Sequence, residues 1–109
     1  MGESPPVLLL CRDLMFVGKV TATARAVGRT VRVIRDPGQL PAEGGRLMVD
    51  LSQKGALEAA AVWREASGGT VIGFAPHVDT ETIARAREAG FEQVLTRGRF
   101  TAELASLIQ

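Results

Sequence analysis

Short apolar runs alternate along the chain with longer stretches of helical periodicity. Residues 7–10 are apolar at every position, which is typical of a strand buried on both faces of a sheet. Phe16, Val20, Ala24 and Val27 then recur at helical spacing, and Gly28 is placed to end that helix. The same criteria predict strands over 30–34, 47–49, 71–74 and 93–95, helices over 55–66 and 79–89, and a last helix capped by Thr101.

Two segments refine this pattern. Residues 30–34 alternate polar and apolar side chains, which indicates a half-exposed strand at the edge of the sheet. Residues 38–45 contain three glycines and Pro41, so we expect a short turn or a shrunken helix there. Strands separated by helices predict an α/β fold with right-handed crossovers. We therefore expect a three-layer, doubly wound parallel sheet in the flavodoxin-like order 2-1-3-4-5, with helix 2 short or missing.

Length and composition limit the classes of protein. A chain of 109 residues predicts one domain over 1–109, with a disordered or extended N-terminus over 1–6. The formal net charge of +1 gives no support for a nucleic-acid partner. One cysteine excludes an internal disulfide, and one histidine makes a transition-metal site improbable. We see no signal peptide and no membrane span, so we expect a cytoplasmic protein.

Candidate site residues follow from the topology. Ligands of an open parallel sheet bind outside the carboxyl ends of its strands. The chemistry-bearing residues expected there are Cys11, Arg12, Asp13, Asp50, His77, Thr96, Arg97 and Arg99. Arg12, Asp13, His77, Thr96 and Arg97 are the crevice or anion-binding candidates. Cys11 is expected to be a small core residue, with a reactive thiol beside Arg12 as the alternative.

Three stretches resemble the receiver domain of two-component response regulators, the CheY-like family. "VLLLCRDLMF" is similar to the first strand and the start of the first helix of that family. "LMVDLSQKG" is similar to the third strand, and the resemblance gives Asp50 the role of phosphoacceptor. "IARAREAGFEQVLTRGRFTAELASLI" is similar to the closing strand and helix. The resemblance covers about the whole chain and implies bacterial two-component signalling.

The departures from the family pattern concern its chemistry. Receivers hold Mg²⁺ with an acidic pair directly after the first strand, and Cys11 and Arg12 stand at those two places. The hydroxyl of the fourth strand falls at Ala75, and the lysine of the fifth strand matches Arg97, or Thr96 with a shift of one residue. The resemblance is therefore to a degenerate pseudo-receiver. We expect no metal and no other cofactor; if a metal did bind, Asp13 and Asp50 would be its ligands.

These observations leave three functional hypotheses. The first is a stand-alone receiver-like domain that acts by protein–protein interaction and is not an enzyme, with Asp50 paired to Arg12 or Arg97. The second is an active phosphoacceptor that phosphorylates itself at Asp50, using either Mg²⁺ or arginine in place of the metal. The third is a sensor of a small anion or nucleotide bound over Arg12, Arg97 and His77, although no glycine-rich phosphate loop is present.

The expected partner is another protein or a second copy of the chain. The resemblance implies a dimer surface formed by helix 4, strand 5 and helix 5 of the family pattern. The charged residues of that region are Arg85, Arg87, Glu88, Glu92, Arg97 and Arg99. A second candidate contact is the apolar cluster Leu14, Met15 and Phe16, since one helix cannot bury three successive side chains.

Overall fold

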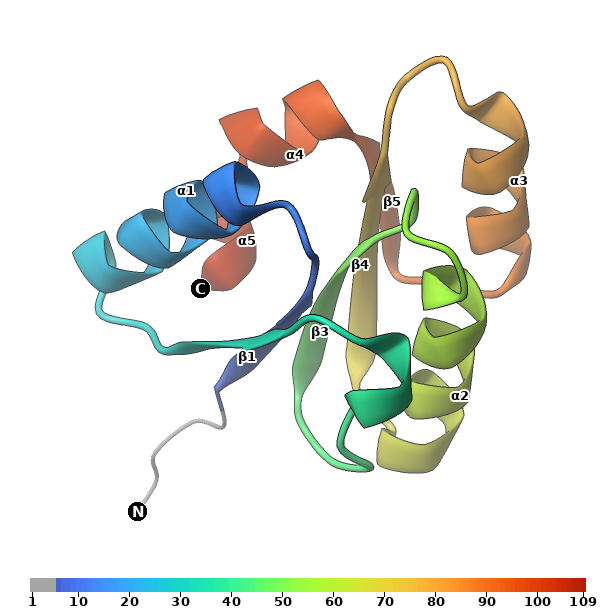
Figure 1. Cartoon of the computed structure of the whole chain (residues 1–109), viewed down its shortest axis with the longest axis horizontal. Helices are drawn as coiled ribbons and strands as arrows, with labels where there is room; N and C mark the ends of the chain where they lie inside the picture. Colours follow the sequence, from blue (N-terminus) through green and yellow to red (C-terminus); the bar gives the residue numbers. More distant parts are fainter. Residues whose placement is uncertain (1–5) are drawn as a thin grey trace.

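Five parallel strands form one sheet in a computed structural model that describes residues 6–109. The strands are β1 (Val7–Leu10), β2 (Val31–Ile34), β3 (Arg46–Asp50), β4 (Thr70–Ala75) and β5 (Gln93–Thr96). Their order is β2-β1-β3-β4-β5 (Figure 1), which confirms the predicted topology and places the alternating strand β2 at an edge. The chain reverses its direction of winding between β1 and β3, so the switch point lies at their carboxyl ends.

Helices cover both faces of the sheet. They are α1 (Leu14–Ala26), α2 (Ala56–Ser67), α3 (Thr80–Glu88), α4 (Arg97–Ala102) and α5 (Leu104–Ile108). Buried side chains of α1, α4 and α5 pack on one face, and those of α2 and α3 pack on the other. Figure 1 shows these two groups of helices on opposite sides of the strands. The result is the three-layer architecture predicted from the sequence.

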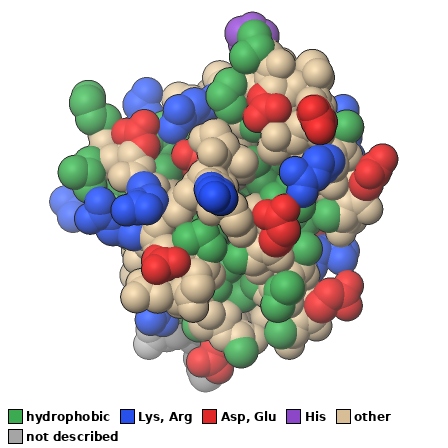
Figure 2. Space-filling view, turned by 45° about the vertical axis from the view of Figure 1, so that its right-hand side comes forward, with side chains coloured by type: hydrophobic (Ala, Val, Ile, Leu, Met, Phe, Trp, Pro, Cys, Tyr) green, Lys and Arg blue, Asp and Glu red, His purple; other side chains and the backbone are tan. Residues whose placement is uncertain are grey.

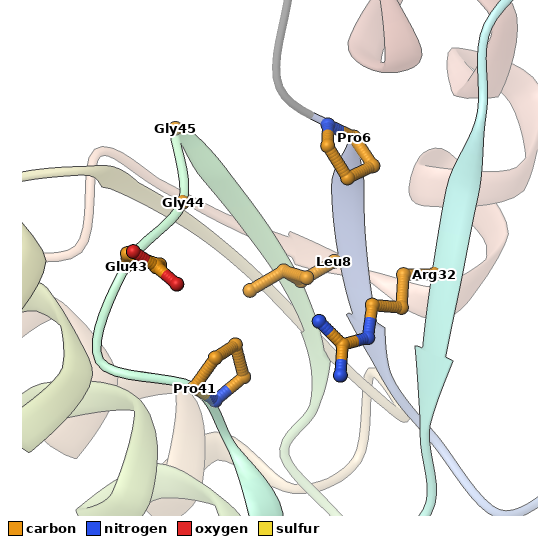
Figure 3. Close-up of a pocket in the computed structure, with 7 residues that line it drawn as sticks. All are labelled: Pro6, Leu8, Arg32, Pro41, Glu43, Gly44 and Gly45. Atoms are coloured by element: carbon orange, nitrogen blue, oxygen red, sulfur yellow. The ribbon is translucent and has the colours of Figure 1, made fainter.

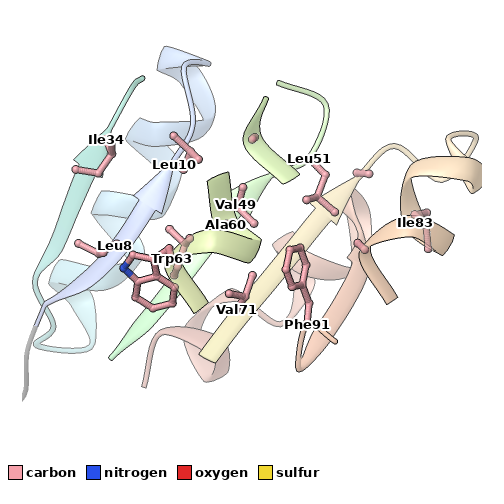
Figure 4. Packing of buried hydrophobic residues seen from close by; sticks show 14 residues of the cluster. Leu8, Leu10, Ile34, Val49, Leu51, Ala60, Trp63, Val71, Ile83 and Phe91 are labelled. Carbon is pink, nitrogen blue, oxygen red and sulfur yellow. The ribbon is translucent and has the colours of Figure 1, made fainter. Parts of the chain in front are cut away.

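The continuous apolar runs are explained by burial on both faces. Successive side chains of a strand point to opposite sides, so β1 sends Leu8 and Leu10 toward α2 and α3 and Leu9 toward α1 and α5. Figure 4 shows the first of these layers, in which Ala60 and Trp63 of α2 pack against the sheet. None of the helices in residues 6–109 has the length and apolar character needed to cross a bilayer.

The helix boundaries follow the expected glycines but not every expected cap. Gly28 and Gly90 follow α1 and α3 with positive φ, a conformation that glycine adopts without strain. Of Asp79 and Thr80, the two caps that the sequence allows for α3, Asp79 is the one used, and its side chain accepts from the backbone N–H of Thr82. The prediction that Thr101 caps the last helix is wrong. The chain turns helical at Arg97, with Thr96 as the cap, five residues before the expected one, and the Thr101 hydroxyl donates to the carbonyl of Arg97 instead.

The crossover between β2 and β3 contains only a 3₁₀ turn, η1 (Pro37–Gln39). Asp36 caps this turn by accepting from the N–H of Gly38. The turn confirms the expectation of a shrunken second helix. The expected disordered or extended N-terminus lies, apart from the exposed Pro6, outside the described residues.

Candidate functional site

Asp50 is the buried carboxylate at the carboxyl end of β3. It is 7% exposed, and it is the only charged or polar residue that is buried among residues 6–109. Its Oδ1 accepts from the backbone N–H of Ser52 at 3.0 Å and from the Ser52 hydroxyl at 2.6 Å. Buried carboxylates need such partners, because water no longer compensates their charge. Oδ1 of Asp50 therefore has both of these hydrogen-bond partners in Ser52, in the loop that follows β3.

The other oxygen of Asp50 faces the guanidinium group of Arg97. Nη2 of Arg97 lies 3.8 Å from Oδ2 of Asp50 and 3.3 Å from Oδ2 of Asp13. Arg97 opens α4 directly after β5, whereas Asp13 follows β1. One cation therefore contacts both carboxylates of the crevice, and it joins the ends of three strands that are distant in sequence.

An aromatic cluster supports the Arg97 side chain. The guanidinium carbon lies 4.6 Å from the centre of the Phe16 ring, a distance at which a cation is attracted to an aromatic face. Phe16 in turn packs on Phe74 and Phe100, and the last two rings stack with their centres 4.2 Å apart. Because the Phe100 and Phe74 rings are buried in the core, the position of Arg97 is tied to the packing of α1 and α4.

Asp13 and Cys11 complete the crevice. Oδ1 of Asp13 accepts from the N–H groups of Met15 and Phe16, so Asp13 also serves as the N-cap of α1. The Cys11 thiol is fully buried, with Sγ 3.8 Å from Oδ2 of Asp50. Burial raises the pKa of this thiol above its ordinary value, and the Asp50 carboxylate acts in the same direction. The core interpretation of Cys11 is therefore favoured over a reactive thiol.

The remaining candidates are not part of this cluster. Arg12 and His77 are exposed, and neither forms an ion pair within residues 6–109. Figure 2 shows the single histidine projecting from the upper edge of the molecule. The Thr96 hydroxyl accepts from the N–H of Arg99 and is committed to the start of α4. Ala75 lies beside Thr96 in the sheet register and offers no hydroxyl.

Charges on the predicted dimer surface are largely paired within the chain. In the labels of the structure this surface is formed by α3, β5, α4 and α5. Arg85 binds Glu58, Glu92 accepts from Nε and Nη2 of Arg64, and Arg99 binds Glu103. Of the six charged residues named for this surface, only Arg87 and Glu88 are outside the ion pairs of the described chain. The surface thus offers few free charges for symmetric salt bridges.

The donor set of the crevice does not match the requirements of magnesium. Mg²⁺ is held octahedrally by carboxylate oxygens and water, and an adjacent guanidinium group repels it. Asp13 and Asp50 are the carboxylates of the crevice, and both already contact Arg97. Across the described part of the chain, no three His, Cys, Asp or Glu side chains are grouped so as to hold a metal ion.

Comparisons with known proteins identify the fold. No family model and no curated protein matches the sequence. Among solved structures, the Francisella response regulator 1452 receiver domain is 16% identical with a TM-score of 0.77, covering 96% of this chain and 93% of that one. The BeF3-activated DrrB receiver domain is 14% identical with a TM-score of 0.77, covering 95% and 93%. A Burkholderia pseudomallei response regulator with a phosphorylated aspartic acid and a calcium ion is 15% identical with a TM-score of 0.76, covering 97% and 67%.

These similarities define the class: the chain has the fold of a response-regulator receiver domain. At such low identities the likeness concerns the fold alone. The site must therefore be judged on its own residues. Sequence reasoning identified Asp50, Asp13, Arg97 and Cys11, which the structure brings together. It missed the roles of Ser52 and Phe16. The Asp-x-Ser spacing, a known turn pattern, was a usable signal for Ser52.

Removing the guanidinium group of Arg97 should destabilise the fold more than removing a comparable exposed one. We expect Arg97→Gln to lower the free energy of unfolding by about 1–2 kcal/mol, between the values for exposed pairs and for fully buried ones. Arg99→Gln is the matched control, since it breaks only the exposed pair with Glu103 and should cost clearly less. Urea unfolding of both variants measures the difference. Equal losses would contradict the bridging role of Arg97.

The raised pKa of Cys11 predicts a loss of stability at alkaline pH. A thiol whose pKa is higher in the folded state than in the unfolded state binds its proton more tightly when folded. Its contribution is complete below the unfolded pKa and declines as the pH rises toward the folded pKa. We expect the wild type to lose stability relative to Cys11→Ala above about pH 9, by up to about 1.4 kcal/mol per pH unit. Urea unfolding over pH 7–10.5 tests this. The chain contains no tyrosine, so no phenol titrates in this pH range. Parallel curves for the two proteins would refute it.

Proposed function

We propose that this chain is a receiver-fold signalling domain that acts by protein–protein interaction, without Mg²⁺-dependent phosphorylation. The observation that carries the proposal is the position of Arg97, whose guanidinium group contacts the carboxylates of Asp13 and Asp50 together. In this arrangement the charge that a metal ion would neutralise is neutralised by the protein itself. In this proposal the ion pairs of the crevice hold the start of α4 against the ends of β1 and β3.

The chemistry of phosphoryl transfer supports the proposal. Catalysis of this reaction depends on positioning and on neutralising the negative charge of the transferred group. Here Asp13 is occupied by Arg97 and by the start of α1, and the place of a second acidic residue is taken by Cys11 or Arg12. Ala75 lacks the hydroxyl of the receiver pattern. The crevice therefore lacks the groups that would bind a metal and report phosphorylation.

One observation favours a second candidate, an arginine-assisted phosphoacceptor. Nε of Arg97 is buried and has no hydrogen-bond partner within residues 6–109. A guanidinium group with a free donor beside a carboxylate nucleophile is suited to binding a phosphoryl oxygen, although this buried donor reaches one only if the Arg97 side chain moves. In this alternative Asp50 is phosphorylated in the absence of any metal, and Arg97 replaces part of the missing neutralisation.

Exposed apolar side chains are consistent with action through protein contact. Leu14 and Met15 are 69% and 86% exposed, while Phe16 turns inward, as the cluster of three predicted. Val62 and Val78 are exposed elsewhere on the described surface. Large apolar groups exposed in this way commonly mark contact surfaces when they are clustered.

Phosphorylation can be tested directly by intact mass. The protein is incubated with acetyl phosphate, once with Mg²⁺ and once with a chelator, beside Asp50→Asn and beside a receiver domain that has the full acidic set. We expect no phosphoryl adduct in either condition, and an adduct on the positive control with Mg²⁺. A metal-independent adduct that disappears in Asp50→Asn would establish the second candidate. An adduct on Asp50 that requires Mg²⁺ would refute the proposal.

A further inference from the structure

The basic residues of the chain are concentrated on α1 and around the edge strand β2. Residues 12–35, which include both elements, contain six of the 13 basic residues of the chain and one of its 12 acidic residues. The six are Arg12, Lys19, Arg25, Arg29, Arg32 and Arg35. Figure 2 shows lysine and arginine side chains gathered at the left of the molecule, on the side where Figure 1 places α1. The rest of the chain is net acidic, so the positive charge belongs to one side of the fold.

The six basic residues have no counter-charge of their own. The arginines that form ion pairs within residues 6–109 are Arg64, Arg85, Arg97 and Arg99. Asp13, the acidic residue of the segment, is bound by Arg97. Five of the six basic side chains are exposed, and that of Arg29 is half-buried. Unpaired cations gathered on one surface produce a positive potential that attracts an anionic partner.

The strand inside this basic region has an unpaired edge. Among the described strands, β2 pairs only with β1. The carbonyls of Thr30 and Ile34 accept from N–H groups of β1. Successive peptide groups of a strand point to opposite sides, so the N–H and C=O groups of Val31 and Val33 point away from β1. Nothing else in residues 6–109 hydrogen-bonds to this edge, which can therefore act as a template for a further strand.

Arg32 lies over a face of the strand that no helix covers. It pairs with Leu8 in the sheet register, so both side chains are on the face that α2 and α3 cover elsewhere. The crossover after β2 provides only η1, and a cavity of about 490 Å³ remains over Leu8. Figure 3 shows the Arg32 side chain extending from β2 toward Leu8, with Glu43 on the opposite wall of the cavity. The two charged groups form no ion pair, so the guanidinium group is available to a carboxylate placed beside β2.

We propose that the edge of β2 binds an extended acidic segment of a partner protein as an additional strand. This inference rests on the proposed function, because it names the surface through which a protein contact is made. Arg29, Arg32 and Arg35 precede, occupy and follow the strand over about 20 Å of extended chain, the length of about six residues of a partner segment. The backbone of the partner pairs with Val31 and Val33, and its carboxylates face the arginines.

Charge argues against a second copy of the chain as the added strand. In a symmetric antiparallel pair formed through β2, the arginines of one copy would lie opposite the arginines of the other. Like charges directly opposite one another across paired strands oppose association. An acidic segment removes this repulsion and supplies the missing counter-charge.

The surface also favours an acidic protein segment over a nucleic acid or a membrane. The large hydrophobic side chains exposed within residues 6–109 are aliphatic, so this surface offers no aromatic group for the stacking of bases. Arg32 lies on the opposite face of the sheet from α1, which carries Lys19 and Arg25. The cations therefore surround an edge instead of forming the single plane that contacts a bilayer.

Hydrogen exchange at two amides reports the addition of a strand directly. The probe is a peptide of alternating glutamate and valine, about eight residues long. Its matched controls are the lysine–valine peptide and the glutamate–valine peptide N-methylated at its central residues, which cannot complete the ladder. We expect the probe to slow exchange of the Val31 and Val33 amides by about tenfold or more in NMR measurements, and the two controls to leave it unchanged. No protection by the probe, or equal protection by either control, would overturn the inference.

Matched variants locate the binding. Arg32→Glu should weaken binding of the glutamate–valine peptide by about tenfold or more, because it reverses the charge at the middle of the site. Arg87→Glu is the control, since it makes the same change of charge at an exposed, unpaired arginine of α3. Equal loss in both variants would refute the assignment. Tighter binding of a DNA duplex or of anionic vesicles than of the peptide, abolished by Arg32→Glu, would refute it as well. The phosphorylation result does not depend on these outcomes, so the two proposals can fail separately.

Discussion

Two carboxylates at the same edge of a parallel sheet need a cation between them. Asp50 is buried at the end of β3, and Asp13 caps the helix that follows β1, so both are held in place by the fold. In this protein the cation is the guanidinium group of Arg97. This choice has a structural consequence that a dissociable metal does not have. The neutralising charge is part of the chain and is present in every molecule.

The position of Arg97 depends on the way the chain turns helical directly after β5. Thr96 caps α4, so Arg97 lies in the first turn of the helix and over the ring of Phe16. Phe16, Phe74 and Phe100 connect this contact to α1, β4 and α4. A change in the ion pairs of Arg97 therefore affects the packing of these rings in the core. The ion pairs of the crevice and the packing of α1 and α4 are therefore expected to change together.

Sequence reasoning predicted the architecture because local signals agree with the global fold. The apolar run of β1, the glycines after α1 and α3, and the prolines and glycines of residues 36–45 each favour the local structure that the fold requires. The start of α4 could not be fixed in this way, since Thr96 and Thr101 are both competent caps; in the structure Thr96 caps the helix and Phe100 is buried within it. For Asp50 the sequence offered Arg12 and Arg97 as partners. The choice depends on which side chain reaches across the sheet, and no spacing along the chain encodes that.

The proposed function depends on Arg97 remaining the cation of the crevice. The direct test is a titration with Mg²⁺, followed by heteronuclear NMR of the backbone and the Arg97 side chain. The account predicts no saturable change at Asp13, Asp50 or Arg97, with the Arg97 resonances remaining those of an ion-paired guanidinium group. Saturable shifts at Asp13 and Asp50 accompanied by release of Arg97 would show that the metal displaces the arginine, and would contradict the account.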